Sequence, residues 1–190
     1  MTNYQCLPEG QILCHGDYKL VPLRYEDIML IKEWRNAQMS ILRQNELLTE
    51  EMQESYYQTV ILPGFSQKEP RQILFSFLLK EECIGYGGIV HIDWPARRGE
   101  VSFLLDVNRI HDPVACQKEF SIYLQLIKQA AFQNLHFNRL YTETFDVRPE
   151  YVVTLESHGF IFEGRLRKHA FVNGQLVDSL IHGCVYTQTK

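Results

Sequence analysis

Three consecutive β-type segments followed directly by one long amphipathic helix constrain the fold of this chain more than any other feature. The segments at residues 72–79, 83–92 and 99–107 are apolar and are separated only by short turns, which predicts an antiparallel meander. In residues 113–132, apolar side chains recur at helical spacing. Antiparallel strands interleaved with helices are typical of the α+β and mixed α/β classes.

The flanking segments complete this pattern. Thr49 and two following acidic residues predict a capped helix start, and the helix is expected to run to about Val60, before Pro63-Gly64 ends it. The Asn173-Gly174 pair between two apolar runs predicts a β-hairpin with a type I′ turn. The other predicted elements are a strand at 18–23, a helix from Tyr25 through Trp34, a strand at 140–145, a helix at 149–157 ended by Gly159, and hairpin strands at 161–172 and 176–186. We therefore expect one domain over residues 18–190 behind an N-terminal arm of residues 1–17, with a mixed, mainly antiparallel central sheet, flanking helices and a C-terminal β-hairpin.

Bulk properties exclude several classes of protein. A net charge of −4 over 190 residues argues against a nucleic-acid binder. The five cysteines are scattered without a CxxC pair, which predicts reduced thiols and no metal site. The sequence has no run of about 20 apolar residues and no secretory-type start. We expect a cytoplasmic protein with no membrane partner.

The C-terminal third carries the most specific pattern. It reads LESHGF at 155–160, FEGR at 162–165, and the hairpin turn at 173–174 before Asp178. This string resembles the ending of GNAT-superfamily N-acetyltransferases, in the subgroup of ribosomal-protein N-terminal and amino-sugar acetyltransferases. The predicted order of elements is also the GNAT order. The resemblance implies the GNAT fold, acetyl-CoA as co-substrate, no metal, and direct transfer of the acetyl group to a primary amine.

The resemblance places the cofactor loop immediately before the long helix. There, N–H groups at a helix start bind pyrophosphate, and glycines allow close approach. In this chain Ala115 and Gln117 stand where the family has glycine, and Asp112 stands where it usually has Arg or Gln. Asp112 and Pro113 also predict an ordinary helix N-cap and N1 pair, whose carboxylate would compete with phosphate. The implied cofactor-binding residues are Leu105, Val107, Arg109, Ala115, Cys116, Gln117 and Arg148, with pantetheine in a notch between residues 104–107 and 140–145.

Two residues are the catalytic candidates. Glu100 opens the strand where relatives often place a carboxylate, which makes it the candidate general base. It could equally be a solvated carboxylate beside Arg97 and Arg98. Tyr151 aligns with the usual acid position of the family, and a phenol with a pKa of about 10 can protonate a leaving thiolate. Tyr151 could instead be a half-buried aromatic side chain.

The helices after the first strand usually shape the acceptor pocket in this family. Their Trp-Arg-Asn tripeptide resembles acetyltransferases that act on amino-sugar nucleotides, and Trp34 fits the core. The candidate substrate-binding residues are Arg35, Arg43 and His91, and His91 is also a second candidate base. The leading hypothesis is acetylation of a small-molecule amine, an amino sugar or its nucleotide. Protein N-terminal or side-chain acetylation and a non-catalytic binding module remain as alternatives, and a homodimer is possible in each case.

Overall fold

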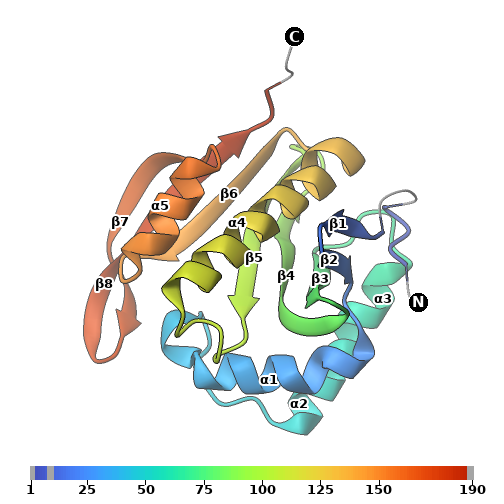
Figure 1. Cartoon of the computed structure of the whole chain (residues 1–190), viewed down its shortest axis with the longest axis horizontal. Helices are drawn as coiled ribbons and strands as arrows, with labels where there is room; N and C mark the ends of the chain where they lie inside the picture. Colours follow the sequence, from blue (N-terminus) through green and yellow to red (C-terminus); the bar gives the residue numbers. More distant parts are fainter. Residues whose placement is uncertain (1–2, 8–10, 188–190) are drawn as a thin grey trace.

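One twisted sheet runs through the molecule, and helices pack against it (Figure 1). The computed structural model describes residues 3–7 and 11–187. Over these residues the strands are β1 (Leu13–His15), β2 (Tyr18–Pro22), β3 (Ile73–Leu79), β4 (Glu82–Asp93), β5 (Arg98–Leu105), β6 (Arg139–Phe145), β7 (Ile161–Val172) and β8 (Gln175–Val185). Their order in the sheet is β1-β2-β3-β4-β5-β6-β8-β7. Neighbouring strands are antiparallel except for β5 and β6, which are parallel, so the predicted mixed sheet is confirmed.

Helices α4 and α5 lie across one face of the sheet, and α1 and α2 lie at the lower end of the view in Figure 1. The α-helices are α1 (Ile28–Ala37), α2 (Glu50–Tyr56), α3 (Leu62–Phe65), α4 (Pro113–Lys128) and α5 (Pro149–Ser157). Short 3₁₀ turns cover Tyr25–Asp27 and Met39–Ile41, and π-helical turns cover Tyr57–Ile61 and Gln129–Asn134. The predicted order of elements is therefore the observed one.

Several local predictions are confirmed in detail. Asn173 and Gly174 have φ values of +49° and +81°, as a type I′ turn requires. Gly159, after α5, has a φ of +82°, the left-handed conformation expected of a glycine at a helix end. The Thr49 hydroxyl accepts a hydrogen bond from the Met52 amide and caps α2.

The predicted end of the second helix is wrong by a few residues. The chain stays helical through Pro63 and Gly64 as far as Phe65. Proline has no N–H and disturbs the regular α-helical bonding before it. A π-helical turn at Tyr57–Ile61 lies just ahead of this proline, so the helix changes its winding and continues.

The first described residues are firmly packed. Tyr4 and Leu7 are buried. The Tyr4 hydroxyl donates to the Leu74 carbonyl at 3.0 Å and accepts from the Leu74 amide at 2.9 Å. The segment expected to be an arm thus contributes to the core, although residues 1–2 and 8–10 lie outside the described residues. The strand β1 also lies within this segment.

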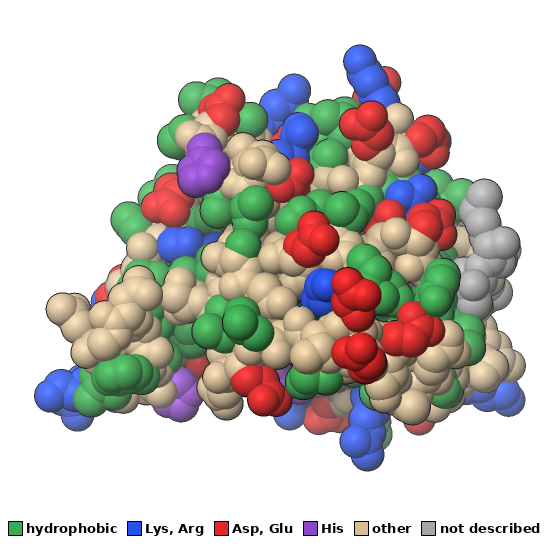
Figure 2. Space-filling model, turned by 90° about the horizontal axis from the view of Figure 1, so that it is seen from below, with side chains coloured by type: hydrophobic (Ala, Val, Ile, Leu, Met, Phe, Trp, Pro, Cys, Tyr) green, Lys and Arg blue, Asp and Glu red, His purple; other side chains and the backbone are tan. Residues whose placement is uncertain are grey.

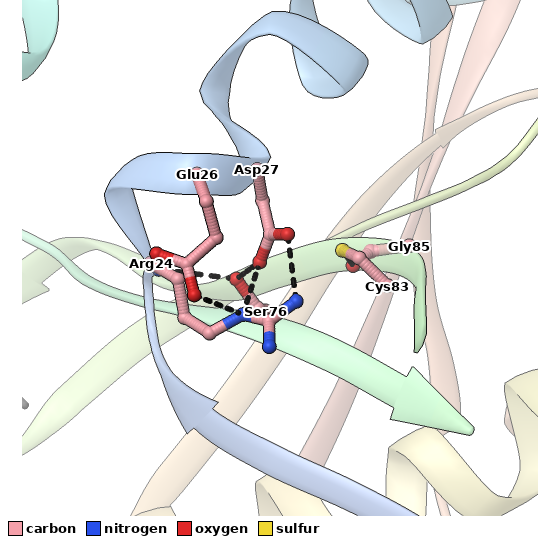
Figure 3. Close-up of polar contacts among 6 residues, drawn as sticks. All are labelled: Arg24, Glu26, Asp27, Ser76, Cys83 and Gly85. Carbon is pink, nitrogen blue, oxygen red and sulfur yellow. Dashed lines mark hydrogen bonds and ion pairs between the residues drawn. The ribbon is translucent and has the colours of Figure 1, made fainter. Parts of the chain in front are cut away.

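A buried ion pair fixes the start of α1 against the sheet (Figure 3). Two nitrogens of Arg24 each lie 2.7 Å from an oxygen of Asp27, whose side chain is almost fully buried. The Ser76 hydroxyl on β3 donates to the same carboxylate at 2.6 Å. Because a buried carboxylate needs partners for its charge and its lone pairs, these contacts position α1 relative to β3.

Strands β5 and β6 part soon after they begin. Their parallel pairing covers only Arg98–Arg139, Gly99–Leu140 and Glu100–Tyr141. Beyond this point β5 stays bonded to β4, and β6 stays bonded to β8. The backbone edges that face each other are therefore left without ladder partners, and a cavity is lined by residues 101–103 on one side and 142–145 on the other. A notch is therefore present between β5 and β6, but its β5 wall is residues 101–103 and not the predicted residues 104–107, none of which lines the cavity.

Candidate active site

A cavity of about 950 Å³ begins in this notch and extends towards α1 and α2. Six of the candidate residues line it: Arg35, Arg43, His91, Glu100, Arg148 and Tyr151. They come from α1, the segment after it, β4, β5 and the region of α5, which are far apart in the sequence. The fold therefore brings together the predicted base, the predicted acid and the predicted acceptor-binding residues.

Glu100 lies at the point where β5 and β6 separate. Its side chain is 9% exposed, and its partners are the Arg43 guanidinium at 2.5 Å and the His91 ring at 2.8 Å. Neither Arg97 nor Arg98 is its ion-pair partner, and Arg98 pairs with Asp93 at the end of β4. The solvated-carboxylate interpretation is therefore wrong, and Glu100 is a buried, held carboxylate on the cavity wall.

His91 occupies an irregularity in β4. The register between β4 and β5 shifts between Val90 and Asp93, and His91 has a φ of +48°. Few non-glycine residues adopt this conformation, and such bulges often re-aim a side chain next to an active site. Here the bulge directs the ring to Glu100 while leaving the His91 side chain 62% exposed.

Arg43 links two acids of the cavity. Besides Glu100, its guanidinium lies 3.4 Å from Glu143 on β6. Glu143 in turn lies 3.6 Å from the exposed His169. The sequence analysis did not select Glu143. The sequence signal available for Glu143 was its place in the alternating pattern of β6. Only the fold shows that it contacts the same arginine as Glu100.

Arg35 is a cation in the cavity wall whose partners are neutral. Its Nε donates to the side-chain oxygen of Gln44 at 3.0 Å, and its Nη1 donates to the Tyr86 hydroxyl at 2.7 Å. Among the described residues no carboxylate forms an ion pair with it. Arg35 is half-buried, so its charge is only partly solvated and can be matched by an anionic ligand.

A second cavity of about 360 Å³ lies beside the first, next to the start of α4. Both cavities share four wall residues: Ile41, Phe120, Arg148 and Tyr151. The Tyr151 ring packs against Phe120 with ring centres 4.9 Å apart, and the Arg148 guanidinium lies 3.9 Å from the centre of the same ring. Tyr151 thus forms much of the partition between the two cavities.

Tyr151 keeps its proton in this setting. Burial raises the pKa of its phenol well above the usual value. Its hydroxyl lies 3.6 Å from the Cys116 sulfur, and burial also raises the pKa of that thiol. Cys116 is 7% exposed, in keeping with the prediction that it is a small buried side chain and not a nucleophile.

The start of α4 is satisfied by the chain itself. Asp112 is the N-cap, and one of its carboxylate oxygens accepts from the amides of Val114 at 3.0 Å and Ala115 at 3.1 Å. The Cys116 amide donates to the Asp112 carbonyl at 2.9 Å. The predicted N-cap and Pro113 at N1 are confirmed, and the amides of Ala115 and Cys116 already have acceptors.

The other residues predicted at the cofactor loop are also engaged or buried. The Arg109 Nε lies 3.0 and 2.9 Å from the two oxygens of Glu119, which is 1% exposed. The carbonyl of the buried Leu105 accepts from the Gln38 side chain at 2.8 Å. Val107 packs against the core. Leu105, Val107, Arg109 and Ala115 do not line either cavity, whereas Cys116 and Gln117 line the smaller one.

Arg148 is the candidate cofactor residue with a free donor. Its Nε is buried and has no hydrogen-bond partner within the described part of the chain. An orphaned buried donor is costly unless a ligand or water satisfies it. Since Arg148 lines both cavities, the wall between them is where an anionic group is best received.

Acidic side chains gather around the outer surface of α1 and α2 (Figure 2). They are Glu26, Glu33, Glu46, Glu50, Glu51 and Glu54. Glu51 also lines the large cavity. Such a rim attracts cations, including protonated amines, and repels polyanions.

Two kinds of feature are absent from the described residues. No helix there combines the length and apolar character needed to cross a bilayer. No group of three or more histidine, cysteine, aspartate or glutamate side chains there is arranged to hold a metal ion.

Comparisons with known proteins agree with this architecture. A family model for the acetyltransferase (GNAT) domain matches residues 20–181. A comparison with curated proteins finds no match. The spermidine N-acetyltransferase of Vibrio cholerae, solved with CoA and spermine, is similar, with a TM-score of 0.76, 18% identity, and coverage of 90% of this chain and 96% of that chain. A dodecameric structure of the Vibrio cholerae spermidine N-acetyltransferase in an intermediate state has a TM-score of 0.72, 18% identity, and coverage of 90% and 95%. At this level of identity the likeness to solved structures shows the fold alone.

Proposed function

Because the chain belongs to the GNAT acetyltransferases and is an acyl-CoA-dependent N-acetyltransferase, we propose that its acceptor is a small primary amine that also carries an anionic group. An amino-sugar nucleotide has this chemistry. The observation that carries the proposal is Arg35, a half-buried guanidinium in the cavity wall with only neutral partners. A phosphate or carboxylate on the acceptor would supply its missing counter-charge.

The residues present fit acetyl-CoA at its thioester and pantetheine end. The separated edges of β5 and β6 expose backbone donors and acceptors along the notch, and the buried Arg148 Nε awaits an acceptor at its wall. Acetyl-CoA supplies an acetyl group activated as a thioester. We expect residues 101–103 of β5 to lie along the pantetheine arm and Arg148 to face a phosphate.

Glu100 is the proposed general base. Its carboxylate lies on the cavity wall and is held by Arg43 and His91. An amine must lose a proton to attack, and a positioned carboxylate can accept that proton directly or through one water. His91 contacts Glu100 and is largely exposed, so it can pass the proton on to solvent.

Tyr151 is the proposed general acid. Its phenol carries a proton at neutral pH, because the ordinary pKa of tyrosine is about 10 and burial raises this pKa further. The hydroxyl lies at the partition between the two cavities, beside the neutral Cys116 thiol. A thiolate leaving group at this wall can therefore receive the proton of the Tyr151 oxygen.

A polyamine is the second candidate acceptor. The acidic rim around α1 and α2, including Glu51 at the cavity, favours an extended cation (Figure 2). Inside the cavity, Arg43 pairs with both Glu100 and Glu143, and its single positive charge balances one of these two carboxylates. Arg35 adds a positive charge that a polyamine cannot match. The rim suits the ammonium group of either acceptor, and Arg35 suits only one with an anionic group.

The test is an acceptor panel with acetyl-CoA as donor, read by release of the free thiol. It contains an amino-sugar nucleotide, the matching free amino sugar, spermidine, and a short peptide with a free N-terminus. We expect the amino-sugar nucleotide to have the highest kcat/KM, and Arg35→Gln to raise its KM by about 10- to 100-fold, the value of one charged hydrogen-bonded contact.

Arg35→Lys is the matched variant, since it keeps the charge and loses the planar donor pair. It should recover part of the lost affinity. The anionic-acceptor proposal fails if spermidine is the best acceptor and Arg35→Gln leaves the KM of every acceptor unchanged.

A further inference from the structure

At the start of α4, the negative charge of Asp112 occupies the place where an added anion would bind. The Asp112 carboxylate accepts from the Val114 and Ala115 amides, where a phosphate oxygen would otherwise accept. A phosphate that approached these amides would have to displace a carboxylate already bonded to them. While the Asp112 carboxylate stays in place, its negative charge also repels the phosphate.

The neighbouring cations do not offset this charge. Arg109 is neutralised by the buried Glu119 through several hydrogen bonds. Lys118 points its ammonium group towards the Tyr18 ring, 5.8 Å from the ring centre, and does not line the smaller cavity. Arg109 is therefore paired within the protein, and the exposed Lys118 does not contribute to the wall of the smaller cavity.

The charges around the smaller cavity are unfavourable for a group with several phosphates. Among the described residues that line it, Arg148 is the one cation and Glu150 is an anion. The exposed Asp112 lies next to this cavity, at the start of α4. One guanidinium matches one phosphate group. The nucleotide end of CoA carries a pyrophosphate and a 3′-phosphate. Once Arg148 has matched one phosphate group, no cation lining this cavity is left for the other phosphate groups.

From this arrangement we infer that the enzyme recognises its acyl donor by the phosphopantetheine arm and not by the nucleotide. Acyl-phosphopantetheine thioesters, free or attached to a carrier protein, are then donors comparable to acetyl-CoA. The inference rests on the proposed function, because the arm is taken to lie in the β5–β6 notch. The transfer is chemically the same for each donor: the C–N bond forms, the C–S bond breaks, and the proton lost by the amine is balanced by the one taken up by the sulfur.

The test compares fragments of the donor by calorimetry on the full chain, so that it does not depend on turnover. The ligands are CoA, 4′-phosphopantetheine, pantetheine and adenosine 3′,5′-bisphosphate. We expect CoA and 4′-phosphopantetheine to have Kd values within about 3-fold, and pantetheine to bind about 10-fold more weakly because it lacks the phosphate that meets Arg148. Adenosine 3′,5′-bisphosphate should not bind at millimolar concentration. Binding of CoA about 100-fold tighter than 4′-phosphopantetheine would overturn the inference.

Two variants separate the residues involved. Asp112→Asn keeps an N-cap side chain and removes its charge, so it should tighten CoA by about 3- to 10-fold and leave 4′-phosphopantetheine unchanged. Arg148→Gln should weaken CoA and 4′-phosphopantetheine alike and leave pantetheine unchanged. If Asp112→Asn does not change CoA binding, the carboxylate is not what excludes the nucleotide, and the inference fails.

Turnover then distinguishes this inference from the proposed function. Acetyl-CoA, acetyl-4′-phosphopantetheine and a carrier protein bearing the acetylated arm are compared with one acceptor. Similar kcat/KM values for the first two support the inference, and a higher value for the carrier protein identifies the arm's protein-bound form as the donor. Efficient turnover of acetyl-CoA alone rejects the inference and leaves the proposed function standing. Absence of turnover with every donor rejects the proposed function, while the calorimetric comparison still decides the donor question.

Discussion

His91 Nδ1 lies 2.8 Å from the Glu100 carboxylate, and this contact joins a buried acid to an exposed ring. The backbone of His91 adopts a φ of +48° within the β4 bulge. Unusual backbone conformations persist where the surroundings enforce them, and they cluster at functional sites. In the proposed mechanism, this pair is the route by which a proton taken up by Glu100 reaches solvent.

The first prediction concerns the proposed base. Glu100→Gln keeps the shape of the side chain and removes its basicity, so kcat should fall by about 10²- to 10⁴-fold with a smaller change in KM. Glu143→Gln is the matched control, because Glu143 lines the same cavity and contacts the same Arg43. It should keep kcat within about 5-fold of the parent, a change well below the loss expected when a catalytic base is removed. Steady-state kinetics decide the matter, and equal losses in the two variants would exclude a special role for Glu100.

The second prediction concerns the proton route. Asparagine tolerates positive φ better than most residues, so His91→Asn should preserve the bulge and the melting temperature. It should lower kcat by about 10-fold, a modest part of what acid–base catalysis contributes. His169→Asn, on the exposed ring beside Glu143, serves as the control. Unchanged kcat in His91→Asn, measured across the pH range, would show that Glu100 exchanges its proton without His91.

Local sequence rules predicted the parts of this molecule that depend on a few adjacent residues. The type I′ turn at Asn173-Gly174, the Thr49 cap and the Asp112-Pro113 start of α4 all follow from short-range geometry. The resemblance of residues 155–178 to the GNAT ending predicted how these local elements are arranged in the fold. These features could be predicted because each is decided within one turn or one hairpin.

Long-range charge pairing could not be predicted in the same way. In the sequence, Glu100 follows two arginines closely, but Arg98 pairs with Asp93 of β4. The partner of Glu100 is Arg43, far away in the chain. Arg109 sits beside the cofactor loop in the sequence, yet its charge is taken up by the buried Glu119. Which charges remain available to a ligand is therefore a property of the packed structure and not of the loop sequence.

The third prediction concerns the proposed acid. Tyr151→Phe retains the ring that packs against Phe120 and Arg148 and removes only the hydroxyl. We expect kcat to fall by about 10- to 100-fold while the melting temperature stays within a few degrees. Cys116→Ala, which removes the neighbouring thiol and leaves the phenol, should retain most activity. Loss of activity in Cys116→Ala but not in Tyr151→Phe would reverse the assignment.

The fourth prediction compares two neighbouring acids shown in Figure 3. Asp27 is buried and bonded to Arg24 and Ser76, whereas Glu26 is exposed and lies 3.5 Å from the same Arg24. Asp27→Asn should lower the free energy of unfolding by about 2–3 kcal/mol, because it breaks a largely buried ion pair. Glu26→Gln should change it by less than about 0.5 kcal/mol, as expected of a surface pair. Denaturant unfolding measures both, and similar values for the two variants would contradict the role assigned to Asp27.

The last prediction concerns the pH dependence of stability. His182 on β8 is fully buried, and neither ring nitrogen has a hydrogen-bond partner among the described residues. Burial lowers its pKa below the ordinary value of 6.5, despite Glu156 at 3.7 Å and the nearby Glu163. The unfolded chain therefore takes up a proton at higher pH than the folded one, so the free energy of unfolding should fall as the pH drops through about 6.5 and should be fully present above it.

His182→Leu removes this proton uptake. The variant should show a flatter dependence of the free energy of unfolding on pH between about 7 and 5 than the parent. His15→Gln, at an exposed position on β1, should keep the parent slope. Denaturant titrations at several pH values give the slopes directly. A slope in His182→Leu as steep as in the parent would assign the acid sensitivity to another group, and a parent that becomes more stable towards pH 5 would show that His182 is charged in the folded state.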